Sequence, residues 1–148
     1  MKLEKVGQVG IAVKDARAAA KGLEEKFGMG PFAILEFDSG KAFYKGEERA
    51  YQSVVAICNF NGLVIELMQQ TDGNTINNDP DYLPPGGQGI HHLGFFVPNA
   101  EEMAKQFEDE GGKVLQKSHP TPNAMTIYLD TKESCGFLVE LIQIGAPK

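Results

Sequence analysis

VGIAVKDARAAAKGLEEKFG, residues 9–28, aligns without a gap with LGFFVPNAEEMAKQFEDEGG, residues 93–112, and seven of the twenty positions are identical. A second match closes each half of the chain, where GLVIELMQ at 62–69 corresponds to GFLVELIQ at 136–143. A fixed pattern that recurs in this way indicates an internal structural repeat. Each half is therefore expected to fold into the same unit.

Each half has the pattern of a strand, a helix and then three strands. Residues 5–13 alternate as a strand, Asp15 is a suitable helix N-cap, and Gly28 ends the helix. The second half repeats this with a strand at 90–97, Asn99 as N-cap and Gly111 after the helix. The apolar helix stripes are Ala16, Ala19, Ala20, Leu23 and Phe27 in the first half and Ala100, Met103, Ala104 and Phe107 in the second. The remaining strands are expected at 31–37, 50–58 and 63–69 and near 113–117, 124–130 and 136–143.

The two units are expected to share one core, because about 70 residues with a single helix are marginally stable alone. We place the first βαβββ module at 1–72, a linker rich in Gly, Pro, Asn and Asp at 73–88, and the second module at 89–148. DSGKAFYKGEERA, with a possible short strand at AFY, and KSHPTPN are interpreted as loops. The predicted fold class is α+β, with two curved mixed sheets around a metal-centred pocket and the helices outside.

Four polar residues occupy repeat-equivalent positions. Gln8 and His92 directly precede the first matched segment, and Glu66 and Glu140 lie inside the second. Both glutamates are flanked on each side by apolar residues, which indicates strands buried on both faces. A buried carboxylate is costly unless it is paired or bound to a metal, and neither strand contains Lys or Arg. This pattern predicts one divalent cation bound by the four side chains.

The donor set narrows the choice of metal. Two carboxylates, one neutral imidazole and one amide oxygen balance a divalent charge and suit Zn, Ni, Co or Mn better than a thiolate-binding metal. Alternation along the strands puts Gln8 on one face with Gly10, and His92 on one face with Gly94, so that small residues leave room for a pocket. The same alternation places His91 on the opposite face from His92, where we expect a structural role.

At these residues the sequence resembles the vicinal oxygen chelate superfamily, which includes glyoxalase I, methylmalonyl-CoA epimerase, extradiol dioxygenases and bleomycin-resistance proteins. The matching stretches are VGQVGIAVKD, GLVIELMQQ, GQGIHHLGFFV and YLDTKESCGFLVELIQ, so the resemblance covers essentially the whole chain. The ligand positions of the superfamily fall on Gln8, Glu66, His92 and Glu140. This ligand set is similar to that of glyoxalase I, whereas the sequence of the stretch GIHHLGFFVPNAEEM resembles the epimerase-like branch more closely.

The resemblance implies a metal-dependent lyase or isomerase, either lactoylglutathione lyase-like or acyl-CoA epimerase-like. In these branches a proton is removed next to a metal-chelated carbonyl by a carboxylate. Glu140 is the leading candidate for this base, with Glu66 as its pseudo-symmetric alternative. Glu48, or its neighbour Glu47, lies roughly where epimerases place a second acid–base residue, although KGEER is also typical of a solvated turn. The implied substrate is a thioester or a hemithioacetal.

Two alternatives stay open at the level of sequence. One is a non-catalytic binding protein of the bleomycin-resistance type, and the other is an extradiol dioxygenase, which fits less well because its site resembles a two-His-one-carboxylate centre. The net charge of −6 argues against nucleic acid or anionic membranes as partners. No apolar stretch approaches a bilayer span and no leader pattern precedes the first strand, so a cytoplasmic protein is expected. The predicted assembly is a homodimer, although the modules can pair within one chain or across two.

Overall fold

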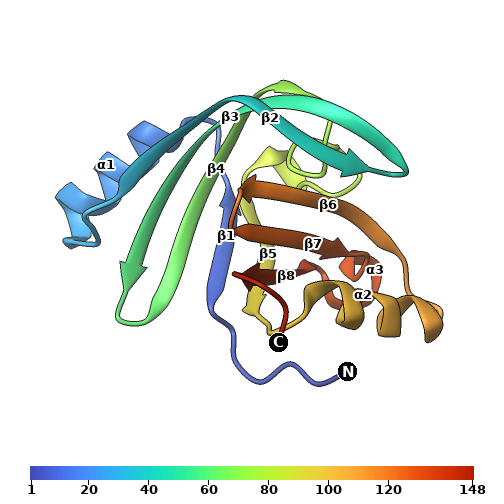
Figure 1. The fold of residues 1–148 in the computed structure, drawn as a ribbon. Helices are drawn as coiled ribbons and strands as arrows, with labels where there is room; N and C mark the ends of the chain where they lie inside the picture. Colours follow the sequence, from blue (N-terminus) through green and yellow to red (C-terminus); the bar gives the residue numbers. More distant parts are fainter.

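Eight strands form one closed sheet in a computed structural model that describes residues 1–148. The order around the sheet is β1-β4-β3-β2-β6-β7-β8-β5. The predicted α+β fold of two βαβββ modules with external helices is confirmed (Figure 1). The elements of the first module are β1 (Gln8–Ala12), α1 (Ala16–Phe27), β2 (Ala33–Tyr44), β3 (Glu47–Phe60) and β4 (Leu63–Gly73). Those of the second are β5 (Gly89–Phe96), α2 (Ala100–Asp109), β6 (Val114–Thr121), β7 (Ala124–Leu129), the short α3 (Lys132–Cys135) and β8 (Leu138–Ile144).

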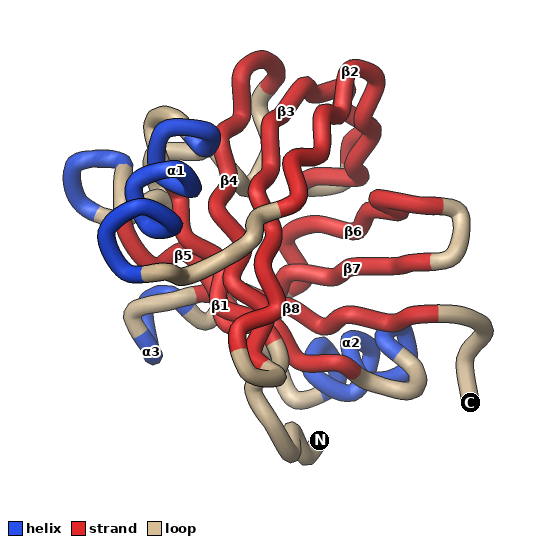
Figure 2. The backbone as a smooth tube through the Cα atoms, turned by 90° about the vertical axis from the view of Figure 1, so that its left-hand side faces the viewer, coloured by secondary structure: helices blue, strands red, loops and turns tan.

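The two modules join within one chain at both ends of their sheets. β1 pairs in parallel with β4 of its own module and antiparallel with β5 of the other. β5 pairs in parallel with β8, and the antiparallel pair of β2 and β6 closes the sheet on the opposite side. Figure 2 shows β1, β4, β5 and β8 converging in the middle of the molecule. None of the helices combines the length and the apolar character that a membrane-spanning helix requires.

Helix α1 covers the outer face of the first module. The Asp15 side chain accepts a hydrogen bond from the Ala18 amide at 2.9 Å, and Gly28 ends the helix with a φ of +64° that favours glycine. Ala16 and Ala20 are buried against β3 and β4, as the apolar stripe predicts. Phe27 is an exception to the predicted apolar stripe, since 74% of its surface is exposed and it does not join the apolar cluster under α1.

Helix α2 covers the second module in the same way. Asn99 accepts a hydrogen bond from the Glu102 amide at 3.1 Å, and the predicted N-cap is confirmed. Ala104 and Ala100 are buried against β7 and β8, and Phe107 packs beside them. A Cβ atom at Gly112 would lie 2.3 Å from the Phe107 ring, so this glycine lets the chain turn back closely over the helix end.

Two segments interpreted as loops are strands instead. β2 continues to Tyr44 and β3 starts at Glu47, so that DSGKAFYKGEERA is a hairpin whose turn is only Lys45 and Gly46. Both turn residues have positive φ, +49° and +83°, which is the conformation of a tight two-residue hairpin turn. KSHPTPN likewise belongs mostly to β6. The exposed polar residues of these strands obscured the strand pattern in the sequence.

The segment between the modules contributes to the core. Thr75 and Ile76 are completely buried, and Ile76 packs with Tyr44 of the first module and with Leu115, Tyr128 and Leu138 of the second. A single 3-10 turn at Pro85–Gly87 is the only regular element before β5. The connection therefore enters the interior before it reaches the second module.

Candidate metal centre

The four predicted ligands come from four neighbouring strands and meet at one place. Gln8 Nε2 lies 3.2 Å from Glu66 Oε2, from Glu140 Oε2 and from His92 Nε2. His92 Nε2 lies 3.3 Å from Glu66 Oε2 and 3.1 Å from Glu140 Oε2. The structure thus brings together one donor from each of β1, β4, β5 and β8.

Two glycines explain how the sheet holds this cluster. Gly10 is paired across the sheet with Glu66 on one side and with His92 on the other. Gly94 is paired in the same manner with Gln8 and with Glu140. Each glycine therefore lies between two ligands in one row, and the missing side chain leaves the space that the ligands fill.

The spacing of the donor atoms fits a small divalent cation. Ligand atoms at about 2.1 Å from such an ion lie about 3.0 Å apart at right angles and about 3.4 Å apart in a tetrahedron. The five separations above fall between these limits. No group of three or more His, Cys, Asp or Glu side chains is arranged for a metal in this structure, so the four-ligand cation site stays a prediction. A half-turn of the Gln8 carboxamide would present Oε1 in place of Nε2.

A bound cation would balance the negative charges of the two carboxylates in the cluster. The side chains of Glu140 and Glu66 are only 5% and 17% exposed, and neither forms an ion pair with Lys or Arg. Burial lowers the pKa of His92, but the charges and hydrogen bonds of Glu140 and Glu66 outweigh burial and raise it to about 10. Without a bound cation, His92 carries a proton whose positive charge partly balances the negative charges of Glu66 and Glu140.

His91 does not lie on the opposite face of the sheet, and that prediction is wrong. The pairing of β1 with β5 shifts register between Gly10 and Ile11, which leaves His91 as the extra residue of a β-bulge. Its Nδ1 lies 3.0 Å from His92 Nδ1, and its Nε2 lies 3.1 Å from the Ile76 carbonyl oxygen. Period-two alternation fails here because a bulge turns two successive side chains to the same side.

The contacts of His91 define the tautomers of both rings. Burial and then His92 lower the pKa of His91 to about 3, so its ring is neutral. Its Nε2–H donates to the Ile76 carbonyl, which leaves Nδ1 as an acceptor for His92 Nδ1–H. His92 Nε2 is then free to face the carboxylates. His91 therefore orients the His92 ring, as outer-shell hydrogen bonds do for metal-binding histidines.

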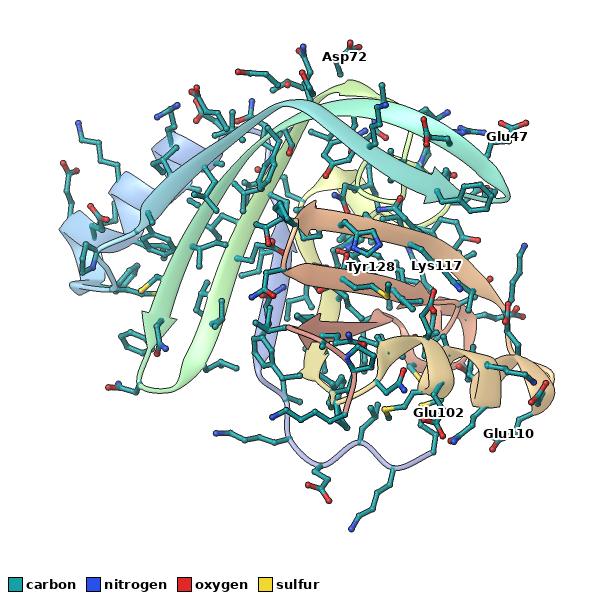
Figure 3. The ribbon with its side chains drawn as sticks, in the orientation of Figure 1. Glu47, Asp72, Glu102, Glu110, Lys117 and Tyr128 are labelled. Atoms are coloured by element: carbon teal, nitrogen blue, oxygen red, sulfur yellow. The ribbon has the colours of Figure 1, made fainter.

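Tyr128 is a site residue that sequence reasoning missed. It is paired with Glu140 across β7 and β8, and its ring lies edge-on to His92 with centroids 5.1 Å apart. Burial, then the charges of Glu140 and Glu66 and a hydrogen bond with Glu140, raise its pKa, so the phenol stays protonated. Figure 3 shows Tyr128 inside the curved sheet. The turn at 132–136 connects two antiparallel strands, and counting back across it from Glu140 leads to Tyr128. This spacing was the signal in the sequence that could have identified Tyr128.

A cavity of about 330 Å³ opens onto the cluster. Gln8, Glu66 and Glu140 lie in its wall together with Tyr128 and Tyr51. Most of the remaining wall is apolar, formed by Leu35, Phe37, Val55, Ile57, Val64, Met68, Phe96, Pro120, Ala124, Ile142 and Ile144. A mostly apolar space in which a small substrate group can lie therefore adjoins the cluster.

Glu48 is not brought together with the four ligands. It lies on β3 with 70% of its side chain exposed, 3.8 Å from Lys41, and it lines a separate surface groove. Glu47 projects from the β2–β3 hairpin into solvent, where it pairs with Arg49 at 3.1 Å (Figure 3). The catalytic role predicted for Glu48 stays a prediction.

Comparison with solved structures shows the same fold in several proteins. The methylmalonyl-CoA epimerase of Streptomyces coelicolor, in complex with 2-nitronate-propionyl-CoA, is 20% identical with a TM-score of 0.70 over 98% of this chain and 100% of that one. The Mycobacterium tuberculosis methylmalonyl-CoA epimerase is 21% identical with a TM-score of 0.66 over 98% and 90%. A mutant 4-hydroxymandelate synthase from S. coelicolor is 16% identical with a TM-score of 0.62, and this chain covers 50% of it. At these identities the likeness establishes the fold alone.

Comparison by sequence identifies the family. No curated protein matches the sequence. The model of the glyoxalase/bleomycin resistance protein/dioxygenase superfamily, however, matches residues 7–128, which include three of the four clustered side chains, Gln8, Glu66 and His92, and the neighbouring Tyr128. This match spans most of the chain and agrees with the repeated βαβββ fold. The chain therefore belongs to the glyoxalase/bleomycin resistance protein/dioxygenase superfamily.

Proposed function

We propose that this protein is a divalent-metal-dependent lyase or epimerase that moves a proton on the carbon next to a carbonyl group. The observation that supports the proposal is the cluster of Gln8, Glu66, His92 and Glu140 beside a mostly apolar cavity. Zn, Ni, Co or Mn fits the mixed oxygen and nitrogen donors. The bound cation would act as a Lewis acid that polarises the substrate carbonyl and makes the adjacent C–H more acidic.

The residues of the chain have separate roles in this reaction. Gln8 and His92 would hold the cation, and His91 keeps the His92 ring oriented through its Nδ1. The apolar wall excludes water from the α-carbon, which strengthens electrostatic interactions within the cavity. Glu140 takes the proton, and its cross-strand neighbour on β7 is Tyr128.

Glu66 is the second carboxylate available for proton transfer. It lies in the wall of the same cavity and comes from the other module. An epimerase must remove a proton from one face of a carbon and return one to the other face. Glu66 and Glu140 are the two carboxylates available for these steps. We favour as substrate an acyl thioester or the hemithioacetal of an α-ketoaldehyde, because each carries an acidic C–H next to a carbonyl group.

Solvent exchange at the α-carbon tests the proposal directly. The zinc- or nickel-loaded protein is incubated in D₂O with acyl-CoA thioesters and with glutathione hemithioacetals, and deuterium uptake is followed by NMR. Glu140→Gln preserves side-chain size and should lower the exchange rate by a factor of about 10² or more, the usual contribution of a general base. Glu66→Gln is the matched control, since it removes an equivalent ligand and should retain exchange once the metal is saturating.

The outcomes separate the open possibilities. Exchange lost in Glu66→Gln and kept in Glu140→Gln would reverse the assignment of the base. If the metal-loaded wild type exchanges no proton in any thioester or hemithioacetal, yet binds small aromatic compounds tightly, a sequestering protein of the bleomycin-resistance type replaces the enzyme. The homodimer and the cytoplasmic location stay predictions from the sequence.

A further inference from the structure

A polar groove of about 520 Å³ lies on the surface next to the mostly apolar cavity. Its charged side chains come from β2, β3 and β6 and carry both signs, namely Glu36, Asp38, Lys41, Glu48, Lys117 and His119. Four residues line the groove and the cavity alike, and these are Phe37, Tyr51, Ser118 and Pro120. They therefore form a common wall between a polar space outside the sheet and an apolar space inside it.

The common wall lies where β2 and β6 separate. The two strands pair only through residues 42–44 of β2 and 116–118 of β6. On the other side of Gly40, the register of β2 against β3 shifts before Phe37, which marks a bulge, and β2 has no further pairing with β6. Figure 1 shows β2 and β6 moving apart from their junction. Side chains, rather than backbone hydrogen bonds, thus separate the groove from the cavity at this gap.

The Tyr51 ring extends across this wall. Tyr51 on β3 pairs with Gly40 on β2, and its ring lies over that glycine. A Cβ atom at Gly40 would be 2.4 Å from Tyr51 Cζ and 2.5 Å from Cε2, so the ring occupies the space of the missing side chain. These atoms belong to the hydroxyl end of the ring, which therefore reaches from β3 over β2, the strand that borders the gap.

Packing holds the Tyr51 ring in this position. The side chain is half-buried, and burial, followed by the charge of Glu66, raises its pKa without a contribution from any hydrogen bond. Ser118 in the same wall differs, because its Oγ is paired with Thr126 Oγ1 at 2.9 Å. A rotation of the Tyr51 side chain would lift the ring off Gly40 and join the groove to the cavity.

We propose that the gap between β2 and β6 is a side entrance through which small polar molecules reach the cavity, and that the Tyr51 ring is its gate. The cavity also has an apolar opening, since Leu35, Phe96 and Ile144 line it and are exposed. A charged molecule loses hydration at an apolar opening, whereas the groove offers it polar partners up to the wall. A phenol suits this boundary because its ring is apolar and its hydroxyl is polar.

Thiol labelling measures access to the cavity from each side. Ser53 and Ile142 both line the cavity but not the groove, and each is only 6% exposed. Ser53→Cys reports on access past Tyr51, which is two residues away on β3, and Ile142→Cys reports on the apolar opening, because Ile142 pairs with Phe96. Both changes are made in a Cys135→Ser protein, which lacks the exposed thiol and keeps only the buried Cys58.

The probe is a methanethiosulfonate with a trimethylammonium group, which is small and permanently charged, and mass spectrometry follows the labelling rate. Tyr51→Ala removes the gate and should raise the rate at Ser53→Cys by about 10- to 1,000-fold, as expected for a gate that is open about 0.1–10% of the time. Tyr51→Phe keeps the ring and should leave this rate unchanged. The rate at Ile142→Cys should be the same with each residue at position 51.

Gly40→Ala moves the ring without removing it and is a second, independent variant. Gly40 has no positive φ, so alanine fits its backbone, but the added Cβ must displace the end of the Tyr51 ring. The labelling rate at Ser53→Cys should therefore rise in Gly40→Ala. In a protein that already carries Tyr51→Ala, the same change should add nothing.

Three results would overturn the inference. Equal rates at Ser53→Cys with and without the Tyr51 ring would exclude a gate. Faster labelling of both reporters in Tyr51→Ala would mean that the ring supports the whole fold rather than closing one side. A gain from Gly40→Ala that persists without the ring would assign closure to the strands themselves. The labelling needs neither a metal nor a substrate, so its outcome is independent of the proposed function.

Discussion

Gly10 leaves the space that the His92 ring occupies in the cluster, because it has no side chain. A Cβ atom at this position would lie 1.9 Å from His92 Cε1, inside the space of the ring. The ring cannot move away, because His92 is completely buried and its neighbours His91 and Tyr128 pack against it. Gly94 leaves similar space beside Gln8, where a Cβ would approach the Gln8 Cβ to 2.9 Å.

Gly10→Ala should therefore displace His92 and weaken zinc binding by about 10- to 100-fold, the usual cost of disturbing the surroundings of a ligand. Affinity is measured by competition with a chromogenic chelator. Gly22→Ala in α1 is the control, because a Cβ there meets no other atom. It should keep the zinc affinity and stabilise the helix by about 0.5–1 kcal/mol. Unchanged affinity in Gly10→Ala would show that His92 is not a ligand.

Among the secondary-structure elements, β2 is joined to the connection between the modules by hydrogen bonds to Asp79. Its carboxylate accepts hydrogen bonds from the Tyr44 hydroxyl and from Lys45 Nζ, the latter at 3.1 Å, and from the Asp81 amide at 2.9 Å. Burial alone would raise the pKa of Asp79, but the hydrogen bonds from Tyr44, Asp81 and Lys45 outweigh burial and lower it below the ordinary 3.8. The folded state thus favours the ionised carboxylate.

Asp79→Asn should lower the free energy of unfolding by about 1–2 kcal/mol at neutral pH, because it replaces a charged acceptor by an amide. The sign of the pH dependence follows from the lowered pKa. The stabilisation is fully present above pH 3.8 and declines as the pH falls through the folded-state pKa, so wild type and variant should converge in acid. Urea unfolding between pH 3 and pH 7 measures this. Asp81→Asn is the control, because it removes the same charge at an exposed side chain and should change the free energy of unfolding little. A difference in this free energy between wild type and Asp79→Asn that grows as the pH falls would contradict the stabilising role of the Asp79 carboxylate.

At the scale of the whole molecule, the candidate metal centre lies where the two modules meet. Gln8 and Glu66 belong to the first module and His92 and Glu140 to the second, and the β1–β5 pair lies between them. On the other side of the closed sheet, β2 and β6 join through only three residue pairs. A cation bound by all four side chains would therefore link the modules beside their longer junction.

Zinc at about one hundred times its dissociation constant should stabilise the protein by about 2.7 kcal/mol, which corresponds to a rise in melting temperature of about 5–10 °C. Differential scanning calorimetry with and without EDTA measures the shift. The double variant Glu66→Gln, Glu140→Gln lacks both carboxylates and should show no response. A wild type whose melting temperature ignores zinc, nickel, cobalt and manganese would contradict a metal site that spans the modules.

The features that depend on neighbouring residues could be predicted from the amino-acid sequence. The repeat predicted two βαβββ modules, and side-chain capping at Asp15 and Asn99 predicted where both helices start. The apolar residues around Glu66 and Glu140 also identified the two strands, β4 and β8, that supply carboxylates to the cluster. Such information is local, because a cap or an alternating strand is recognisable within a few residues.

The features that depend on pairing between distant strands could not be predicted from the sequence and were seen only in the folded chain. The bulge that turns His91 toward His92 arises from the register of β1 against β5, and the closure of the sheet within one chain arises from β1–β5 and β2–β6. Burial of Ile76 and the contact of Tyr128 with Glu140 likewise join segments far apart in sequence. Register and closure are set by the free energy of packing the whole sheet, and no short stretch of sequence carries that information.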